Sequence, residues 1–568
     1  MLRSRALILL IFLLLGPALS SCYAFIPTPT PVPTVVPTFV PPTPTPEPTV
    51  DPRLGGRLTV RLSHNLDRLT PLLPATDIEA GWVLGMLYAG LTRLDDRLQP
   101  QPDLAERWDV SSNGLVITFT LRPNLRWSDG TPLTADDVLF TYGTLRMWDV
   151  RTGAQANLRD YVAGVTAPTS RTVALVLNRR LAGILADVSF PILPRHIWGH
   201  LGPAAVQDVD LLPNPVGSGP FILRERRQGE ALLLTPNPYY HGAPPFLDEV
   251  AFLVAPEDNV AELALRQGDL HVALLPRACC DSLEQSPPRN PVRVGRYPAS
   301  QYTFVAFNLH EGFPMADVRL RQAWALALDK EALVAEATGG EGIPLWSPIL
   351  RPGYALDETL SSVGPDLTAA RALVAEAGWE DNDGDGIVEK DGEPLQVRLF
   401  VRADAPERIT ATLHISETLG QIGIAVQVIP ADFQSVIAAK LRPPYDFDAL
   451  CMQWRNLGPD PDQFYLFHSS QAWQGLGDTR ANLYNFVGYR RAEADQLLLT
   501  GRSTYDPVQR REIYVELQRL LAQDLPYYLL WGDPIYIAAN GHLTTDEGPI
   551  NLETPQLFWN VEEWYWGE

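Results

Sequence analysis

The chain has 568 residues and a formal net charge of −22 at pH 7, with 45 basic residues against 67 acidic ones. This balance argues against nucleic acid or an anionic lipid surface as the partner, although the sign of the charge identifies no ligand. The length exceeds that of one compact domain and predicts two or three domains.

The N-terminus has the features of a signal peptide. Arg3 and Arg5 precede an apolar run over residues 6–15, which is too short to span a bilayer as a helix and is typical of a signal-peptide core. The run ends in the sequence LSSC, which resembles the lipobox of bacterial lipoproteins. We therefore expect residues 1–21 to be removed and Cys22 to be lipidated. A secretory signal that is cut elsewhere is the alternative.

A Pro/Thr-rich segment follows, so residues 22–53 are predicted to comprise the lipidated cysteine and a tether. Because each proline lacks a backbone donor and the segment has little apolar surface, we expect an extended, polyproline-like spacer. At about 3.1 Å per residue, its reach is on the order of 80 Å. These features predict an extracytoplasmic protein that is anchored to the membrane surface, either at the cell surface or in the periplasm.

Three cysteines remain in the mature chain: Cys279, Cys280 and Cys451. An odd number of cysteines cannot pair completely within one chain. A bridge between the two adjacent residues, a long-range bridge to Cys451 and three unpaired thiols all remain open. Nothing in the spacing indicates a disulfide-dependent scaffold.

Strands and helices alternate along the rest of the chain. Residues 114–123 alternate apolar and polar side chains, as a half-buried strand does, and a turn with the sequence WSDGTP follows. Thr134 and Asp137 then form a capping-box-like start of a helix. Two more helices are predicted at 409–420 and from Asp506 onwards, and two more strands at 424–430 and 527–531. The fold class is α/β with mixed sheets.

Six segments of the chain follow one another in an order typical of one protein family. The first covers residues 90–142 and contains the text RWSDGTPLTADDVLFTY. The others are ILPRHIW, GSGPF, NPYYHGAPPFLDEV, FNLHEGFPMADVRLRQAWALALDKEALV and YDFDALCMQW. Together they resemble the family 5 extracellular solute-binding proteins, the peptide and nickel class that serves ABC importers. The resemblance covers essentially everything after the tether.

The resemblance implies a two-lobed, periplasmic-binding-protein-like fold of type II with mixed sheets and an extra N-terminal subdomain. Lobe I would comprise residues 54–305, with the inserted subdomain at about 96–212. Lobe II would comprise residues 306–529, and residues 530–568 would return to lobe I. The ligand would be enclosed between the lobes by hinge closure.

The resemblance also implies binding and delivery, with no bond made or broken in the ligand. The expected ligand is an oligopeptide or a similar extended solute, and the expected partners are an ABC permease pair with ATPase subunits. A monomer that needs no cofactor is expected. Two alternatives remain: a sugar or other non-peptide ligand on the same fold, and an extracytoplasmic sensor or adhesin that takes no part in transport.

The sequence predicts no enzyme. Ser218 stands in the text VGSGP, but a nucleophile elbow needs glycine two residues before and after the serine, and Val216 and Pro220 occupy those places. His196 and His200 have the spacing of a zinc pair, yet no glutamate lies between them to act as a base.

Candidate ligand contacts follow from the resemblance and from the residue types that binding pockets use, which are aromatic surfaces with a few polar anchors. Each candidate also has an ordinary structural explanation. The candidates are Asn308, Trp454, Arg455, Asp460, Asn485 and Trp531.

Asp460 is a candidate because of a departure from the family pattern. In peptide binders of the family, an aspartate after the cleft tryptophan pairs with the free amino terminus of the peptide, but Leu457 stands at that place here. A leucine cannot neutralise a buried ammonium, which is costly to leave unpaired. Either Asp460 has taken over this role, or the ligand presents no free amino terminus here. We favour the second interpretation, because the text DPDQF matches the family without a shift.

The segment DNDGDGIVEKDGEP from Asp381 resembles a calcium loop. Position 12 of such a loop should be a bidentate glutamate but is Gly392, and a strand pattern rather than a helix follows Pro394. The loop is therefore not a calcium sensor. It is either a solvated turn or a weak structural calcium site, whose ligands would be Asp381, Asp383, Asp385, the Ile387 carbonyl and Glu389.

Overall fold

The computed structural model describes residues 51–72, 77–147, 153–200, 215–286, 290–475, 478 and 484–567. The predicted signal peptide, Cys22 and the tether up to residue 50 lie outside this range. No helix among the described residues is both long enough and apolar enough to cross a membrane.

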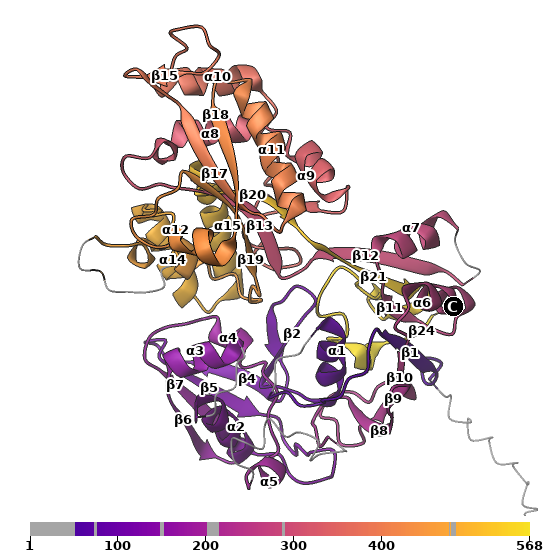
Figure 1. The fold of residues 1–568 in the computed structure, drawn as a ribbon. Helices are drawn as coiled ribbons and strands as arrows, with labels where there is room; N and C mark the ends of the chain where they lie inside the picture. The colour runs from indigo at the N-terminus through magenta and orange to yellow at the C-terminus, as the bar shows by residue number, and fades with distance from the viewer. Residues whose placement is uncertain are drawn as a thin grey trace, which may run out of the picture. The chain divides into compact units, whose positions relative to one another are not determined.

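A seven-stranded mixed sheet combines strands from both ends of the chain, in the order β12-β21-β11-β1-β10-β9-β8 (Figure 1). Helix α1 packs on one face through Trp82, Val83 and Met86, and α6 and α7 pack with Ala273 and Ala538 in a separate cluster. The strands are β1 (Arg57–Leu62), β8 (Phe221–Arg227), β9 (Ala231–Pro236), β10 (Glu249–Val254), β11 (Val272–Leu274), β12 (Val292–Pro298) and β21 (Pro534–Asn540). The helices are α1 (Ile78–Leu87), α6 (Asp258–Gln267) and α7 (Arg277–Gln285).

A four-stranded antiparallel sheet, in the order β4-β5-β7-β6, has its own hydrophobic core. Ile117, Phe119 and Leu121 of β5 point into this core, which confirms the alternation predicted for that strand. The backbone N–H of Thr134 donates to the Asp137 carboxylate at 2.9 Å, which confirms the predicted helix start. The elements are β4 (Ala105–Val110), β5 (Val116–Leu121), β6 (Val162–Thr169), β7 (Thr172–Leu177), α2 (Ala135–Met147), α3 (Gly153–Tyr161), α4 (Ile184–Asp187) and α5 (Arg195–Trp198).

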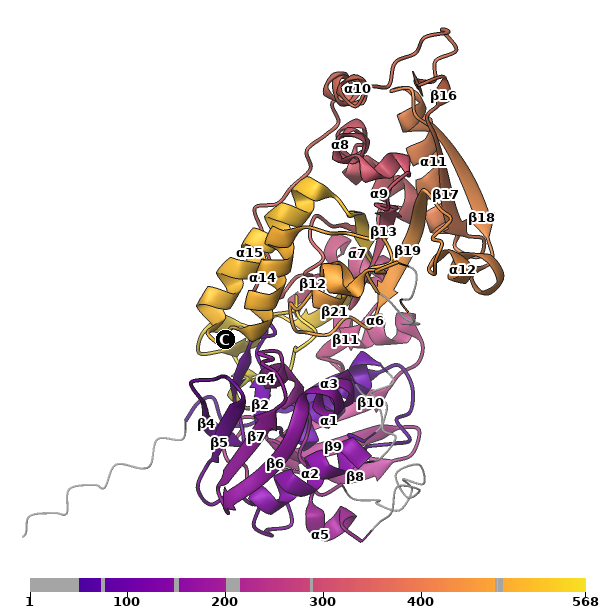
Figure 2. The same cartoon turned by 90° about the vertical axis from the view of Figure 1, so that its left-hand side faces the viewer.

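A six-stranded mixed sheet, in the order β14-β20-β13-β19-β17-β18, is covered by helices on both faces. Val305 and Phe307 pack with residues of α8 to α11, whereas Phe304 and Ala306 pack with residues of α14 and α15. Figure 2 shows α14 and α15 side by side. The strands are β13 (Gln301–Phe307), β14 (Ile343–Pro344), β17 (Gln396–Arg402), β18 (Ala425–Ala431), β19 (Ala449–Arg455) and β20 (Tyr527–Gly532). The helices are α8 (Val318–Ala327), α9 (Lys330–Thr338), α10 (Leu367–Glu376), α11 (Pro406–Gly420), α14 (Ala492–Ser503) and α15 (Pro507–Asp524).

Smaller elements complete the described part. They are β2 (Thr92–Leu94) with β3 (Pro100–Pro102), β15 (Glu389–Lys390) with β16 (Glu393–Pro394), the sheet of β22 (Leu543–Thr545), β23 (Gly548–Pro549) and β24 (Tyr565–Trp566), and the short helices α12 (Ala438–Lys440) and α13 (Phe464–Phe467). The predicted α/β class with mixed sheets is confirmed.

Two direct strand connections carry the chain between the seven-stranded and six-stranded sheets. Strand β12 leads into β13 through residues 299–300, and β20 leads into β21 through Asp533. The backbone N–H of Ala299 donates to the Asp533 carbonyl at 2.8 Å, so the two connections lie against each other. We call this place the strand crossing. The lobe boundaries inferred from the resemblance stay predictions.

Candidate functional site

The strand crossing is held by the side chain of Asp533. Its carboxylate accepts hydrogen bonds from the Trp531 indole at 3.1 Å, from the Gln453 amide at 3.2 Å and from the Gln301 amide. These donors come from β20, β19 and β13, so one carboxylate joins three strands where the chain passes between sheets. Trp531, a predicted ligand contact, is only 1% exposed, and its indole N–H donates to Asp533 at this junction.

A cavity of about 660 Å³ lies beside the crossing. Its wall combines the end of β1, the start of α1, the loop after β11, the start of β21 and Glu341 after α9. These segments are far apart in the sequence, and the cavity is of the size that small-molecule sites use. We regard it as the first part of the candidate site.

The deep charges of this cavity are satisfied by the protein itself. Glu79 accepts hydrogen bonds from the backbone N–H and the hydroxyl of Ser63, both at 2.7 Å. Arg61, which is 2% exposed, donates to three backbone carbonyls and pairs with Asp258 at 2.7 Å. The more exposed wall carries both signs of charge, on Asp77, Arg277 and Glu341.

The half-buried Trp454 and the exposed Tyr465 and Tyr484 form an aromatic patch in the six-stranded sheet region. Tyr465 is 38% exposed and Tyr484 is 49% exposed. The ring centroids lie 6.1 Å apart for Trp454 and Tyr484, and 6.2 Å apart for Tyr465 and Tyr484. Phe304 stacks behind Trp454 at 6.0 Å. Exposed ring surface of this kind is characteristic of binding sites, and the aromatic patch is the second part of the candidate site.

The acids that follow Trp454 pair with buried arginines. Asp460 accepts two hydrogen bonds from the Arg510 guanidinium, both at 2.7 Å. Asp462 accepts one from Arg502 at 2.8 Å. Bidentate pairs of this kind are among the stronger polar contacts in proteins. Asp460 is therefore already engaged within the fold.

The aromatic patch also touches the region of the four-stranded sheet. The hydroxyls of Tyr161 and Tyr465 lie 2.8 Å apart, and the Arg502 guanidinium lies within 5.4 Å of both ring centroids. The backbone N–H of Ala182 donates to the Arg502 carbonyl at 2.8 Å. Gly183 follows directly, and a side chain there would meet the Asp460 carboxylate at 3.0 Å. This close approach joins the two regions beside the candidate site.

The two predicted asparagines are buried and bonded to the backbone. Asn308 donates to the carbonyls of Tyr445 and Phe447 and accepts from the N–H of His310. Asn485 donates to the carbonyls of His468 and Tyr489 and accepts from the N–H of Tyr489. Both amides thereby fix the loops around them. Arg455 is exposed, with its guanidinium donating to Gln453 at 2.7 Å.

The acidic loop at 381–389 brings its carboxylates together. One ligand oxygen from each of Asp381, Asp383, Asp385 and Glu389 lies within 4.8 Å of the others. The Asp381 carboxylate also accepts the N–H groups of Gly384 and Gly386, whose positive φ angles turn the chain around it. Strand β17 follows Pro394 in place of a helix, which confirms the predicted strand and places the loop outside the EF-hand class.

The residues considered for catalysis have structural partners. The hydroxyl of Ser218 is buried and accepts the N–H of Ala89 at 3.2 Å. His196 lies 2.8 Å from the Asp129 carboxylate. Cys279, Cys280 and Cys451 are free thiols, which resolves the alternatives that the sequence left open.

Comparison with known proteins identifies the family. Residues 99–475 match the model for the middle region of bacterial extracellular solute-binding proteins, family 5. The chain belongs to this family. It is 30% identical over 501 residues to the oligopeptide-binding protein AppA of Bacillus subtilis, covering 86% of this chain and 87% of AppA.

Other relatives and solved structures agree with this family assignment. The chain is 28% identical to the probable D,D-dipeptide-binding periplasmic protein DdpA of Escherichia coli, covering 77% of this chain and 80% of DdpA. The structure of AppA in complex with a nonapeptide matches with a TM-score of 0.58 and 28% identity, covering 91% of this chain and 100% of AppA. The unliganded open form of the murein tripeptide binding protein MppA, at 20% identity, matches with a TM-score of 0.72 and covers 90% of this chain and 97% of MppA. The predicted type II binding-protein fold is confirmed.

Sequence reasoning missed the cavity and most of the aromatic patch of this solute-binding protein. The cavity combines residues such as Ser63, Leu274 and Tyr536, which no local motif connects. Tyr465 and Tyr484 had a usable signal, because the segments QFYLF and NLYNF place aromatic residues shortly after Trp454.

Asp187 yields a prediction about pH. Burial, with Asp460 and Asp462 nearby, raises the pKa of Asp187 to about 8, although Asn157 donates to its carboxylate at 2.9 Å. The folded protein therefore holds a proton that the unfolded chain releases near pH 4, so this group lowers stability as pH rises from about 4 to about 8. The asparagine of the Asp187→Asn variant cannot ionise. The melting temperature of this variant should therefore fall less than that of the unmodified protein between pH 5 and pH 9.

The exposed Asp160 provides the control for this measurement. Asp160→Asn should give a curve of melting temperature against pH parallel to that of the unmodified protein. If the melting temperature of Asp187→Asn also changes with pH in parallel with that of the unmodified protein, Asp187 is ionised in the folded protein and its pKa is not raised.

Proposed function

We propose that this protein captures oligopeptides outside the cytoplasm and delivers them to an ABC permease pair driven by ATPase subunits. The proposal is carried by the extended similarity to AppA, whose solved structure contains a nonapeptide. The ligand leaves the protein unchanged, because the protein's task is binding and release.

The geometry of the candidate site supports a peptide ligand. Rings of the aromatic patch offer contact area without sequence preference, and the exposed cavity wall offers charges of both signs near the crossing. A peptide carries apolar, polar and charged groups along one chain, so it can use both parts. Trp454 remains the predicted residue with the best-placed side chain for such contact.

The anchoring of the ligand is proposed to differ from that of family members that bind a free amino terminus. Leu457 packs against the hydrophobic cluster around Phe304, and Asp460 is engaged by Arg510. Removing Asp460 from this pair would leave a buried guanidinium without its partner, at a cost of several kcal/mol. We propose that no free amino terminus is bound at this place.

Calorimetry with matched peptides tests these proposals. Oligopeptides should bind the unmodified protein, and acetylation of their amino termini should change the affinity less than tenfold. Tyr484→Ala should weaken binding by about tenfold, since a buried aromatic contact is worth on the order of 1 kcal/mol or more.

Tyr239 supplies the matched control, because it is 43% exposed but lies in the turn after β9. Tyr239→Ala should bind peptides as the unmodified protein does. Absence of binding to any oligopeptide, together with binding of a sugar, would contradict the peptide proposal. Loss of binding on acetylation would contradict only the proposal about the amino terminus.

A lipid anchor at Cys22 is proposed from the sequence LSSC and the tether. Cys22→Ser should move the protein from the membrane fraction to the soluble fraction with an unchanged melting temperature, because the tether separates the anchor from the fold. Cys279→Ser is the control and should stay with the membrane. If the Cys22→Ser protein also sediments with membranes in the absence of detergent, the anchor lies elsewhere.

A structural calcium ion is proposed for the loop at 381–389, because its four carboxylates converge. Since binding to the native state stabilises it, calcium at millimolar concentration should raise the melting temperature above that measured in a chelator. Asp383→Asn should reduce this rise, and Asp391→Asn, just outside the cluster, should leave it intact. An identical melting temperature with calcium and with chelator would identify the loop as a solvated turn.

A further inference from the structure

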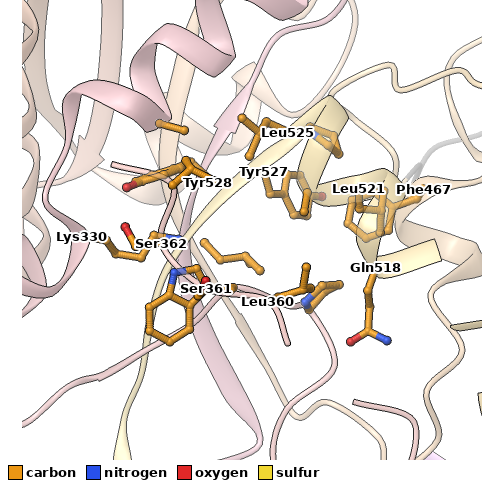
Figure 3. A pocket seen from close by; sticks show the side chains of 17 residues that line it. Lys330, Leu360, Ser361, Ser362, Phe467, Gln518, Leu521, Leu525, Tyr527 and Tyr528 are labelled. Atoms are coloured by element: carbon orange, nitrogen blue, oxygen red, sulfur yellow. The ribbon is translucent and has the colours of Figure 1, made fainter. Parts of the chain in front are cut away.

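A second cavity lies inside the six-stranded sheet region, apart from the candidate site. It is bounded by the start of α9, the end of α15, strand β20 and the segment 346–363. Its volume is about 80 Å³. On the same measure, one water molecule needs about 10–15 Å³. The cavity therefore has room for roughly six non-hydrogen atoms. Figure 3 shows Lys330, Ser361 and Ser362 at one end of this cavity and Phe467 and Leu521 at the other.

Lys330 places an ammonium group at the first end of the cavity. Its side chain is only 6% exposed, and its Nζ donates to the Leu345 carbonyl at 2.9 Å. The nitrogen lies 4.4 Å from the centroid of the Tyr528 ring. Burial lowers the pKa of Lys330 to about 7. An ammonium has three donors, so this group retains hydrogen-bonding capacity for a further acceptor.

The ring of Trp346 lines the same wall. Its indole Nε1 is buried and has no hydrogen-bond partner among the described residues, and its ring lies 5.7 Å from the Lys330 nitrogen. A buried donor without a partner is unfavourable. The indole N–H is too deeply buried to be reached from the cavity, so Lys330 is the donor that faces it.

The other end of the cavity is apolar except for Gln518, whose amide is already hydrogen-bonded within the fold (Figure 3). Phe467, Leu521 and Leu525 line it, together with the ring of Tyr527. A ligand that satisfies both ends needs an acceptor head with negative charge and a short hydrocarbon chain. A cation would be repelled by Lys330, and a neutral hydrocarbon would leave the remaining donors of Lys330 unused.

We propose that this cavity binds a short aliphatic carboxylate, whose head group pairs with Lys330 and whose chain packs on Phe467, Leu521 and Leu525. Butanoate, with six non-hydrogen atoms, has the appropriate size. The site is formed by residues 325–363, 467 and 518–529 alone, so it is separate from the cavity beside the strand crossing. It also borders Tyr527, whose ring packs on Phe304 at 4.3 Å behind the aromatic patch.

Calorimetric titration of the full mature chain with butanoate tests this proposal. Saturable binding with one site is expected, and the neutral isostere butanamide should bind at least tenfold more weakly. Lys330→Met should weaken butanoate binding at least tenfold.

Lys390 gives the matched control. It also donates to one carbonyl, that of Ala377 at 2.9 Å, and lies 5.9 Å from the centroid of a tryptophan ring, that of Trp379, but it is exposed. Lys390→Met should bind butanoate as the unmodified protein does. If Lys330→Met does not fold, the comparison of butanoate with butanamide decides. Absence of butanoate binding, or equal binding by the folded Lys330→Met protein, would overturn the proposal and leave the cavity to water.

Discussion

The fold depends on the strand crossing, where the chain passes twice between its two larger sheets. Asp533 accepts hydrogen bonds from Gln301, Gln453 and Trp531 and so ties three strands together at this point. The β12–β13 and β20–β21 connections are short. The hydrogen bond from the Ala299 N–H to the Asp533 carbonyl holds them side by side. Rotation about such a pair of connections is a common way to open and close a binding protein.

The candidate site takes its character from what the crossing places next to it. The cavity begins at Pro534, directly after Asp533, and Trp454 directly follows Gln453 on β19. Buried charged side chains pair with one another within the fold, as Asp460 and Arg510 do. The rings of the aromatic patch and the exposed wall of the cavity remain accessible to a ligand. This division suits a protein that accepts varied peptides through contacts that do not depend on one buried anchor.

Much of the fold could be predicted, because its signals are local. The alternation at Ile117 and Phe119 and the cap at Thr134 each depend on neighbouring residues. The site was harder to predict from the sequence, because its walls combine segments that lie hundreds of residues apart in the chain. Sequence also cannot show where a polar side chain points: Asn308 was selected as a contact, and its amide is taken up by the carbonyls of Tyr445 and Phe447.

We propose that ligand binding closes the two sheet regions about the strand crossing. Small-angle X-ray scattering of the mature chain, with and without a saturating peptide identified by calorimetry, tests it most directly. A ligand gains affinity through contacts that exist only in the closed state, so it shifts the population towards that state. The radius of gyration should therefore be smaller with peptide than without it. An unchanged radius at saturation would contradict it.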